Sequence, residues 1–503
     1  MRLSRASGVL LHPTSLPGQH GSGDLGREAY HFVDWLVAAG QRLWQVLPLT
    51  GIGSGNSPYM SSSAFAGNPL LVDLVELQRE GWLDEADLAP AEGLQAARVN
   101  FAAVVPYRMQ RLTKAARRFA ADGSAAHRAD FERFRAEQAS WLGDYALFMA
   151  LGERPAPQGE RDWPSWEPAL ARHDRQALAE AREQHAGRVA FWEFCQWRFF
   201  RQWAALRAYA NGKGVRIVGD APIFIAHSSA EVWANPDLFE LDAQGRPTAV
   251  AGVPPDFFSA TGQRWGNPLY RWSEHAKDGY AWWVERVRRT FELVDIVRID
   301  HFRAFAGYWE IPADEPTAMH GRWVPGPGAA LFEAIAKALG PLPIIAEDLG
   351  VITPDVHDLR QRFAFPGMCV LQFAFNSDAA NRYLPHHHEP GSVVYAGTHD
   401  NNTSAGWWAE AAESERHFAR GYLATDGHDM PWALIRSAMA SVADTCVHPM
   451  QDVLGLPGTC RMNHPGQPSG WWEWRLQWNQ VQPWHAERLL EFGRLYGRLR
   501  PAS

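Results

Sequence analysis

Residues 295–303 read Asp-Ile-Val-Arg-Ile-Asp-His-Phe-Arg, a short β-branched run that ends in a dense group of ionisable side chains. The pattern predicts a buried strand that brings polar residues to a site at its end. Because alternate residues of a strand share a face, Arg298 and Asp300 are expected to point the same way, with Val297 and Ile299 packed behind them. A guanidinium beside a carboxyl group favours the ionised form of that group. The pair therefore suits either a charged catalytic carboxylate or a buried structural ion pair.

Similar strand-like segments recur along the whole chain, most of them followed by a segment with helical periodicity. The eight predicted strands are centred on Val9, Leu43, Ile217, Val297, Ile345, Val370, Val394 and Val447. Eight alternating units of this kind predict an α/β fold, the closed parallel (β/α)8 or TIM barrel. The segment after Met450 is short and partly helical in pattern, so no C-terminal β-sandwich domain is expected.

Long insertions interrupt the alternation and divide the chain into three predicted parts. Residues 1–73 hold the first barrel strands and a Gly-, Ser- and Asn-rich loop that is expected to contact substrate. Residues 74–187 are rich in Ala, Arg and Glu and predict a helical insertion subdomain. Residues 188–503 contain the remainder of the barrel, including a stretch at 252–270 in which a proline pair is flanked by glycines. That combination suits a mobile loop that moves as a unit.

The composition argues against several classes of partner. The formal net charge is −8, whereas binding to nucleic acid or to a membrane surface needs a basic stripe. No apolar run approaches the length of a membrane span. The four cysteines, Cys195, Cys369, Cys446 and Cys460, are scattered without a Cys-x-x-Cys pair. We therefore expect no nucleic-acid or membrane partner and a reducing, cytoplasmic setting, with the oligomeric state left open.

Tryptophan is frequent, with 24 Trp against 12 Tyr, and many Trp residues adjoin Gly, Pro or Asn, as in residues 265–268 and 470–474. Flat aromatic rings suit the C–H faces of sugars. Tryptophan is equally a core residue, so each of these positions has two interpretations.

Three acidic residues end the fourth, fifth and seventh predicted strands: Asp300, Glu347 and Asp400. Barrel enzymes place their chemistry at this rim, so the three carboxyl groups are expected to converge. Glycoside chemistry uses one carboxylate as nucleophile and one carboxylic acid as proton donor. Asp300 beside Arg298 suits the nucleophile, and Glu347, which leaves an apolar run next to another acid, suits the proton donor because its pKa should be raised. Asp400 would bind sugar hydroxyls or stabilise positive charge.

Each acid also has a structural interpretation, because acids at strand ends often cap the following helix. Asp348 is assigned that capping role, since it points away from Glu347 in an ideal strand. His399 and Asp400 can face the same cleft only if their strand has already turned into a loop. The run His386-His-His is not expected to bind metal, because three successive residues cannot all face one ion in regular structure. No metal and no cofactor are predicted.

Five motifs, at residues 57–69, 254–268, 298–303, 346–350 and 397–401, make the chain resemble the 4-α-glucanotransferases, or amylomaltases, a branch of the α-amylase-like barrels. The resemblance implies that Asp300 is the nucleophile, Glu347 the acid/base and Asp400 the transition-state stabiliser. It also implies substrate contacts from Ser57, Tyr59, Asp256, Trp265, Arg298, His301 and His399. One position departs from the family pattern, because Trp471 stands where asparagine is usual.

The resemblance implies a retaining transfer of α-1,4-glucan segments, with maltooligosaccharides and starch- or glycogen-derived glucans as partners. Two alternatives remain open at this point. A hydrolytic α-glucosidase or amylase would use the same carboxylates, and a non-catalytic glucan-binding protein would explain the tryptophans without any product. Elongation of maltotriose distinguishes transfer from both.

Overall fold

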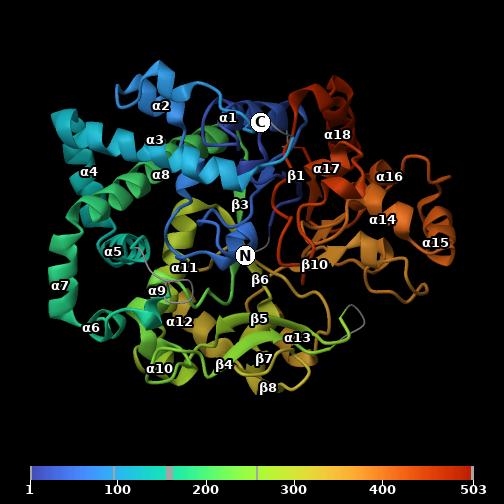
Figure 1. Ribbon diagram of the computed structural model, residues 1–503. Coiled ribbons are helices and arrows are strands. Elements are labelled where there is room, and N and C mark those ends of the chain that lie inside the picture. The colour runs from blue at the N-terminus through green and yellow to red at the C-terminus, as the bar shows by residue number, and fades with distance from the viewer. Residues whose placement is uncertain (1–2, 95–96, 155–161, 256–258, 500–503) are drawn as a thin grey trace.

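In the computed structural model, which describes residues 3–94, 97–154, 162–255 and 259–499, eight parallel strands form a barrel at the centre of the molecule (Figure 1). Their order around the barrel is β10 (Gly367–Val370), β11 (Ser392–Tyr395), β12 (Thr445–Pro449), β1 (Ala6–Leu10), β2 (Leu43–Gln45), β3 (Arg216–Pro222), β6 (Ile296–Asp300) and β9 (Ile344–Ala346). β9 and β10 are the two ends of this sheet and are not paired as strands. The Ala346 N–H donates to the Pro366 carbonyl at 2.9 Å and so connects β9 to the residue before β10. The predicted (β/α)8 barrel is confirmed.

Helices cover the outside of the barrel. In α1 (Arg27–Ala38) the buried residues Ala29, Phe32, Val33 and Leu36 follow helical spacing and form one apolar stripe. The other covering helices are α8 (Ala186–Gly212), α11 (Ala281–Leu293), α12 (Ala329–Leu339), α13 (Pro354–Arg362), α16 (Met430–Ala440) and α18 (Pro483–Leu495). The described residues after β12 form helices and loops without a strand, in keeping with the expected absence of a β-sandwich.

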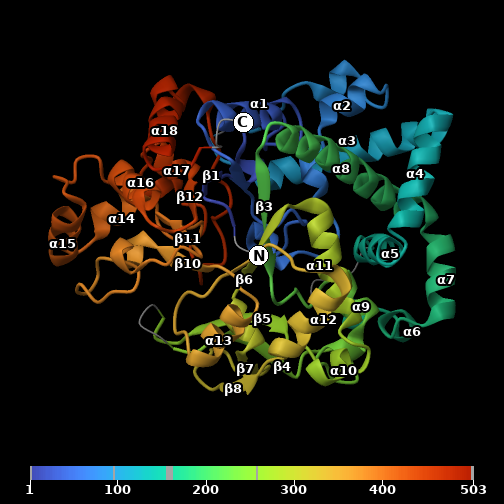
Figure 2. The ribbon, with the colours of Figure 1, turned by 180° about the vertical axis from the view of Figure 1, so that it is seen from behind.

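Helices between β2 and β3 extend one flank of the molecule, whereas α14 (Ser404–Glu410) and α15 (Glu413–Leu423) lie on the opposite flank, as Figures 1 and 2 both show. The first group comprises α2 (Leu74–Arg79), α3 (Phe101–Asp122), α4 (Ala125–Glu137), α5 (Leu142–Gly152), α6 (Pro168–Ala171) and α7 (Arg175–Gln184). Within it, α3, α4, α5 and α7 contact α8. Such packing explains why α8 is buried around most of its circumference, since both the barrel and this helical group cover it.

A second, antiparallel sheet lies beside the barrel in the order β5 (Gln263–Pro268), β4 (Ala249–Val253), β7 (Gly307–Pro312) and β8 (Arg322–Pro325). Both ends of the predicted loop at 252–270 are strand, because Gly252 and Val253 belong to β4 and pair with residues of β5. The sequence analysis did not predict these two strands, which are short and contain Gly and Pro. The remaining short helices are α9 (Ala230–Ala234), α10 (Trp272–Lys277) and α17 (Met450–Val453). None of the helices in the described ranges is both long and apolar enough to cross a membrane.

Candidate active site

The buried Arg298 side chain holds two carboxylates at the ends of adjacent strands. Its Nη2 lies 2.9 Å from Asp300 Oδ1, which confirms that these two residues of β6 share a face. Its Nη1 lies 2.8 and 2.7 Å from the two carboxylate oxygens of Asp220 on β3. Burial alone would lower the pKa of Arg298, but Asp220 and Asp300 raise it well above its usual value. The guanidinium is therefore a fixed positive charge behind Asp300.

Asp220 was not among the predicted site residues, although it ends a strand as the other acids do. In the β3–β6 register Asp220 is the direct partner of Arg298, so the pairing follows from the sheet itself. The sequence signal was present in the run Ile217-Val-Gly-Asp, but only the neighbouring strand shows which charge the carboxylate meets.

Tyr59 connects this strand pair to the loop after β11, on the opposite side of the same rim of the barrel. The short 3₁₀ helix that holds it, η3 (Pro58–Met60), is capped by Ser57, whose Oγ accepts the Tyr59 N–H at 3.2 Å. The Tyr59 hydroxyl donates to Asp220 Oδ2 at 3.0 Å and lies 2.9 Å from His399 Nε2. The Tyr59 and His399 rings stack with centroids 5.5 Å apart. A chain of polar contacts thus runs from Arg298 to His399.

Glu347 follows β9 directly, and its carboxyl group accepts two backbone N–H groups. Oε2 accepts from His301 at 2.7 Å, and Oε1 accepts from Leu349 at 3.1 Å. Burial is the main reason that the pKa of Glu347 is raised to about 7; Arg298 and the two backbone hydrogen bonds oppose the shift, and Asp300 adds to it. The raised pKa agrees with the sequence expectation and keeps the protonated form of Glu347 available at neutral pH.

Asp400 and His399 lie in the loop after β11, which ends at Tyr395, so both can face the cleft as the prediction required. Asp400 Oδ1 accepts from Asn463 Nδ2 at 2.6 Å, and Oδ2 lies 3.3 Å from His399 Nε2. Arg461 donates to the main-chain carbonyl of Asp400. Contacts from the 461–463 loop therefore fix the position of Asp400, and sequence reasoning missed both Arg461 and Asn463.

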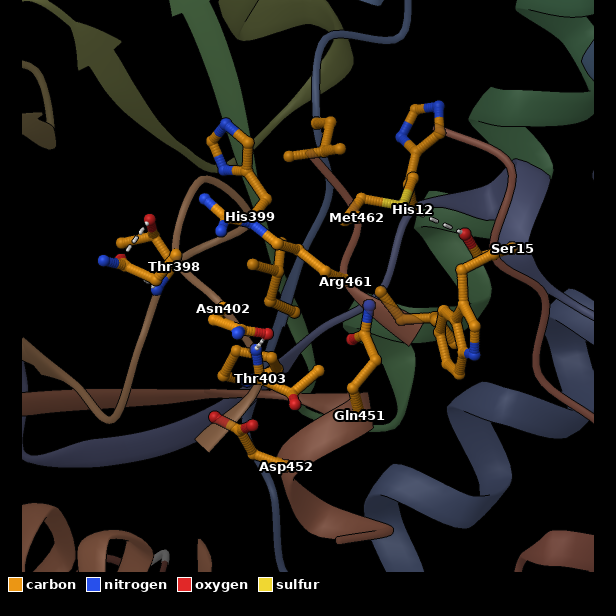
Figure 3. Close-up of a pocket in the computed structure, with 16 residues that line it drawn as sticks. His12, Ser15, Thr398, His399, Asn402, Thr403, Gln451, Asp452, Arg461 and Met462 are labelled. Carbon is orange, nitrogen blue, oxygen red and sulfur yellow. Dashed lines mark hydrogen bonds between the residues drawn. The ribbon is translucent and has the colours of Figure 1, made fainter. Parts of the chain in front are cut away.

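A pocket adjoins this loop at the rim formed by β1, β11 and β12 (Figure 3). His399 lies at the upper end of the view and Asp452 at the lower end, with Arg461 between them. The buried His12 also lines it, and burial lowers the pKa of His12 to about 3, so its ring is neutral at pH 7. The lining combines polar residues, such as His399 and Asp452, with leucines from the end of β1, the residue after it and the segment after β2.

His301 and Trp265 form the wall next to Glu347. His301 has a left-handed backbone with φ of 52°, which turns the chain sharply after β6. Burial lowers the pKa of His301 to about 4, so the imidazole is neutral at pH 7. Trp265 on β5 meets this ring edge to face, with centroids 4.8 Å apart. Asp256, predicted with Trp265 to contact substrate, lies outside the described residues.

Asp348 does not cap the next helix, so the prediction for it was wrong. Its Oδ1 accepts the Met368 N–H at 2.7 Å, and its Oδ2 lies 3.2 Å from Arg360. The side chain joins the end of β9 to the start of β10 across the gap in the barrel. A Cβ at position 367 would lie 2.5 Å from Asp348 Oδ2, so Gly367 leaves the space for this contact.

Trp472 is a further residue that sequence reasoning missed. Its ring lies 5.7 Å from Tyr59 and 6.0 Å from His399 between centroids, and its backbone is left-handed with φ of 69°. The neighbouring Trp471 points elsewhere, with its ring 5.5 Å from that of His464. The tryptophans at 470–474 were interpreted as either sugar contacts or core residues, and only the fold shows which ring meets the cleft.

The run of three histidines is used for local contacts. His386 and His387 both contact the Ala379 carbonyl, while His388 contacts Ser441 and the Tyr383 carbonyl. Within the part of the chain that the structure describes, no group of His, Cys, Asp and Glu is arranged to hold a metal ion.

The model of glycoside hydrolase family 77, described as 4-alpha-glucanotransferase, matches residues 11–481. The chain belongs to this 4-α-glucanotransferase family. It is 50% identical to the 4-alpha-glucanotransferase of Thermus thermophilus, over 97% of this chain and 98% of that protein. It is 45% identical to the chloroplastic/amyloplastic enzyme DPE1 of Arabidopsis thaliana, over 98% of this chain and 86% of that protein.

A solved structure titled as an amylomaltase from Streptococcus agalactiae in complex with acarbose superimposes with a TM-score of 0.95 at 38% identity. It covers 99% of this chain and 100% of that chain. Membership of the family makes the chain an enzyme that transfers glucan segments, as the sequence predicted. The hydrolytic and non-catalytic alternatives are not favoured.

Proposed function

We propose that the cleft carries out a retaining double displacement on α-1,4-glucans. Asp300 attacks the anomeric carbon and forms a glycosyl-enzyme, while Glu347 donates its proton to the departing glycosidic oxygen. Asp400 stabilises the positive charge that develops on the sugar ring. The observation that carries this proposal is the difference between the surroundings of two neighbouring acids. Asp300 is bound to a buried guanidinium, whereas the pKa of Glu347 is raised to about 7.

In the second half of the reaction Glu347 is ionised and acts as the base. It takes the proton from the 4-hydroxyl of an acceptor glucan, whose oxygen then attacks the anomeric carbon and displaces Asp300. The chain is thereby returned to an α-1,4 bond, and Glu347 regains its proton. Water must be excluded from this step, because it would compete with the acceptor. Trp265 and the hairpin that carries it would bind the acceptor glucan and help to exclude water.

Further residues bind the sugar ring next to the scissile bond in this proposal. Arg298, His399 and the neutral His301 donate to its hydroxyl groups, and Tyr59 packs against the ring. Ser57 and Asp256 complete the predicted set of contacts. The neutral state of His301 supports such a role, because a neutral imidazole has one hydrogen-bond donor and one acceptor. It can therefore donate a hydrogen bond to a sugar hydroxyl or accept one from it.

The proposed substrates are maltooligosaccharides and glucans derived from starch or glycogen. We assign the protein to the cytoplasm, which its four unpaired cysteines support. We further assign residues 74–187 as an insertion subdomain and residues 252–270 as a loop that closes on the glucan. Packing of α3, α4, α5 and α7 on α8 supports the first assignment.

Incubation with maltotriose alone tests the function. We expect glucose together with maltotetraose and longer products, because one glucan serves as donor and another as acceptor. Release of glucose and maltose without elongation would contradict transfer, and the absence of any product would contradict catalysis.

A further inference from the structure

Three exposed apolar side chains lie on the edge strand β8 or near it. Trp323 is 42% exposed, Met319 in the preceding turn is 52% exposed, and Val351 on the loop after Glu347 is 67% exposed. Single exposed apolar side chains are ordinary, but a group of them beside a binding cleft marks an interaction surface. We call these three residues the β8 patch.

The Trp323 ring is held in place from two sides. The Arg303 guanidinium lies 3.9 Å from its centroid, and Nη1 of the same arginine donates to the Val351 carbonyl and to Thr353 Oγ1, each at 3.0 Å. Trp309, the register partner of Trp323 in β7, packs against it edge-on at 5.3 Å. A ring fixed in this way loses little conformational entropy when it binds a ligand.

The β8 patch is linked to the Glu347 side of the active site through Arg303. Arg303 follows His301 by two residues, and the His301 N–H binds the Glu347 carboxyl group. Val351 lies on the same loop as Glu347, and Arg303 ties that loop to Trp323. From the reach of these short links, the Trp323 ring lies within about 20 Å of the Glu347 carboxyl group, a distance that a few glucose units span.

We propose that the β8 patch is a remote subsite for a long α-1,4-glucan whose reacting part lies in the cleft, with Trp323 stacked on the apolar face of a glucose ring. The inference rests on the proposed function. The Arg303 guanidinium, which lies over one face of the ring, can donate to sugar hydroxyls at the ring edge, and this combination of apolar and polar groups matches that of a sugar. A protein partner fits less well, because a stable interface needs about 800 Å² on each partner and the exposed Arg322 and His320 interrupt the patch.

Trp323→Ala compared with Trp484→Ala tests the subsite. Trp484 is 46% exposed and lies on α18, far from β8 in both ribbon views (Figures 1 and 2). We expect Trp323→Ala to lower kcat/KM with long amylose about three- to tenfold and to leave kcat/KM with maltotriose within about twofold. Trp484→Ala should change neither value. Trp323→Phe, which keeps a flat apolar ring, should fall between Trp323→Ala and the unmodified enzyme.

Each contrary result has a distinct meaning. Unchanged use of amylose by Trp323→Ala, in a protein that elongates maltotriose, would overturn the subsite and leave the proposed function intact. An equal loss on both substrates would also overturn it, because a remote subsite does not affect a short donor. If the unmodified protein failed to elongate maltotriose, the proposed function would fail instead. In that case, migration in native gels that contain amylose would test the β8 patch. If amylose slowed Trp323→Ala as much as the unmodified protein, the subsite would be overturned.

Discussion

The two sides of the cleft hold their carboxylates in different ways. On one side, Asp220, Arg298 and Asp300 lie on the adjacent barrel strands β3 and β6, and the strand register makes Asp220 and Arg298 direct partners. On the other side, Asp400 lies in a loop and is positioned by Asn463 and Arg461 from a second loop. The strand side is held rigid by the hydrogen-bonded barrel sheet, whereas the loop side depends on contacts between segments that are far apart in sequence.

This contrast assigns different tasks to the two sides. The strand side is expected to determine the rate of bond breaking, because an attacking oxygen must be held within a fraction of an ångström. The loop side, with its aromatic rings Tyr59 and Trp472, is expected to contribute more to substrate binding. Substitutions on the two sides should therefore separate into effects on kcat and effects on KM.

The largest effect is expected on the strand side, from Asp300→Asn. The amide keeps the shape of the side chain but cannot form the glycosyl-enzyme, so kcat should fall about 10⁴-fold. The measurement is glucose release from maltotriose. Asp314→Asn, at an exposed position between β7 and β8, is the matched control and should retain full activity. Near-normal turnover of Asp300→Asn would contradict the role of Asp300 as nucleophile and, with it, the assignment of the chemistry to the strand side.

Asp220→Asn should have the next largest effect, although Asp220 is proposed as a positioning residue without substrate contact. With one of its two carboxylates neutral, Arg298 can shift, and displacement of Asp300 should lower kcat about 100-fold. KM should change little, and Asp220→Glu should recover part of the activity if the charge matters. A loss that appears only in KM would contradict the assignment of the strand side to chemistry.

Trp472→Ala probes the loop side. Removal of the ring that packs on Tyr59 and His399 should raise KM for maltotriose about tenfold and change kcat by less than about threefold. Trp471→Ala is the neighbouring control, since its ring contacts His464 instead. If Trp472→Ala mainly lowered kcat, the loop side would share in the chemistry and the division between the two sides would fail.

The smallest effect is a pH dependence set by Glu347. The first step needs the protonated acid, so activity should be maintained below the pKa and should fall as pH rises through about 7. From pH 7 to pH 8 the protonated fraction, and with it the rate of the glycosylation step, should fall about fivefold. Single-turnover measurements across this range give the profile. Glu347→Gln, which cannot titrate, should be slow at every pH and show no such decline; the same decline in this variant would assign it to another group.

The strand side was largely predictable from the sequence, and the loop side was only partly so. The shared face of Arg298 and Asp300 and the raised pKa at Glu347 follow from strand alternation and from the apolar run before Glu347. Asp220 could be placed at a strand end, but its pairing needs the neighbouring strand. Asn463 carries no local signal, and the tryptophans at 470–474 do not show which ring faces the cleft, because both roles arise from a loop that folds back onto His399 and Asp400.

The misassigned residues have physical causes as well. Asp348 was expected to cap a helix, but in the folded barrel its carboxylate binds the Met368 N–H and Arg360 instead. The small antiparallel sheet was missed because its strands contain Gly252, Gly266 and Pro268, which are rare in longer strands. Both cases depend on contacts between segments that local sequence patterns do not encode.

The most direct test of the account is to trap the covalent intermediate and locate it. Glu347→Gln incubated with an α-maltosyl fluoride, whose leaving group needs no proton, should accumulate a maltosyl-enzyme, because the variant cannot activate the acceptor that resolves it. Peptide mass spectrometry is predicted to find the added mass on Asp300. Attachment to Asp220, Asp400 or any other residue would contradict the central claim that the strand side supplies the nucleophile.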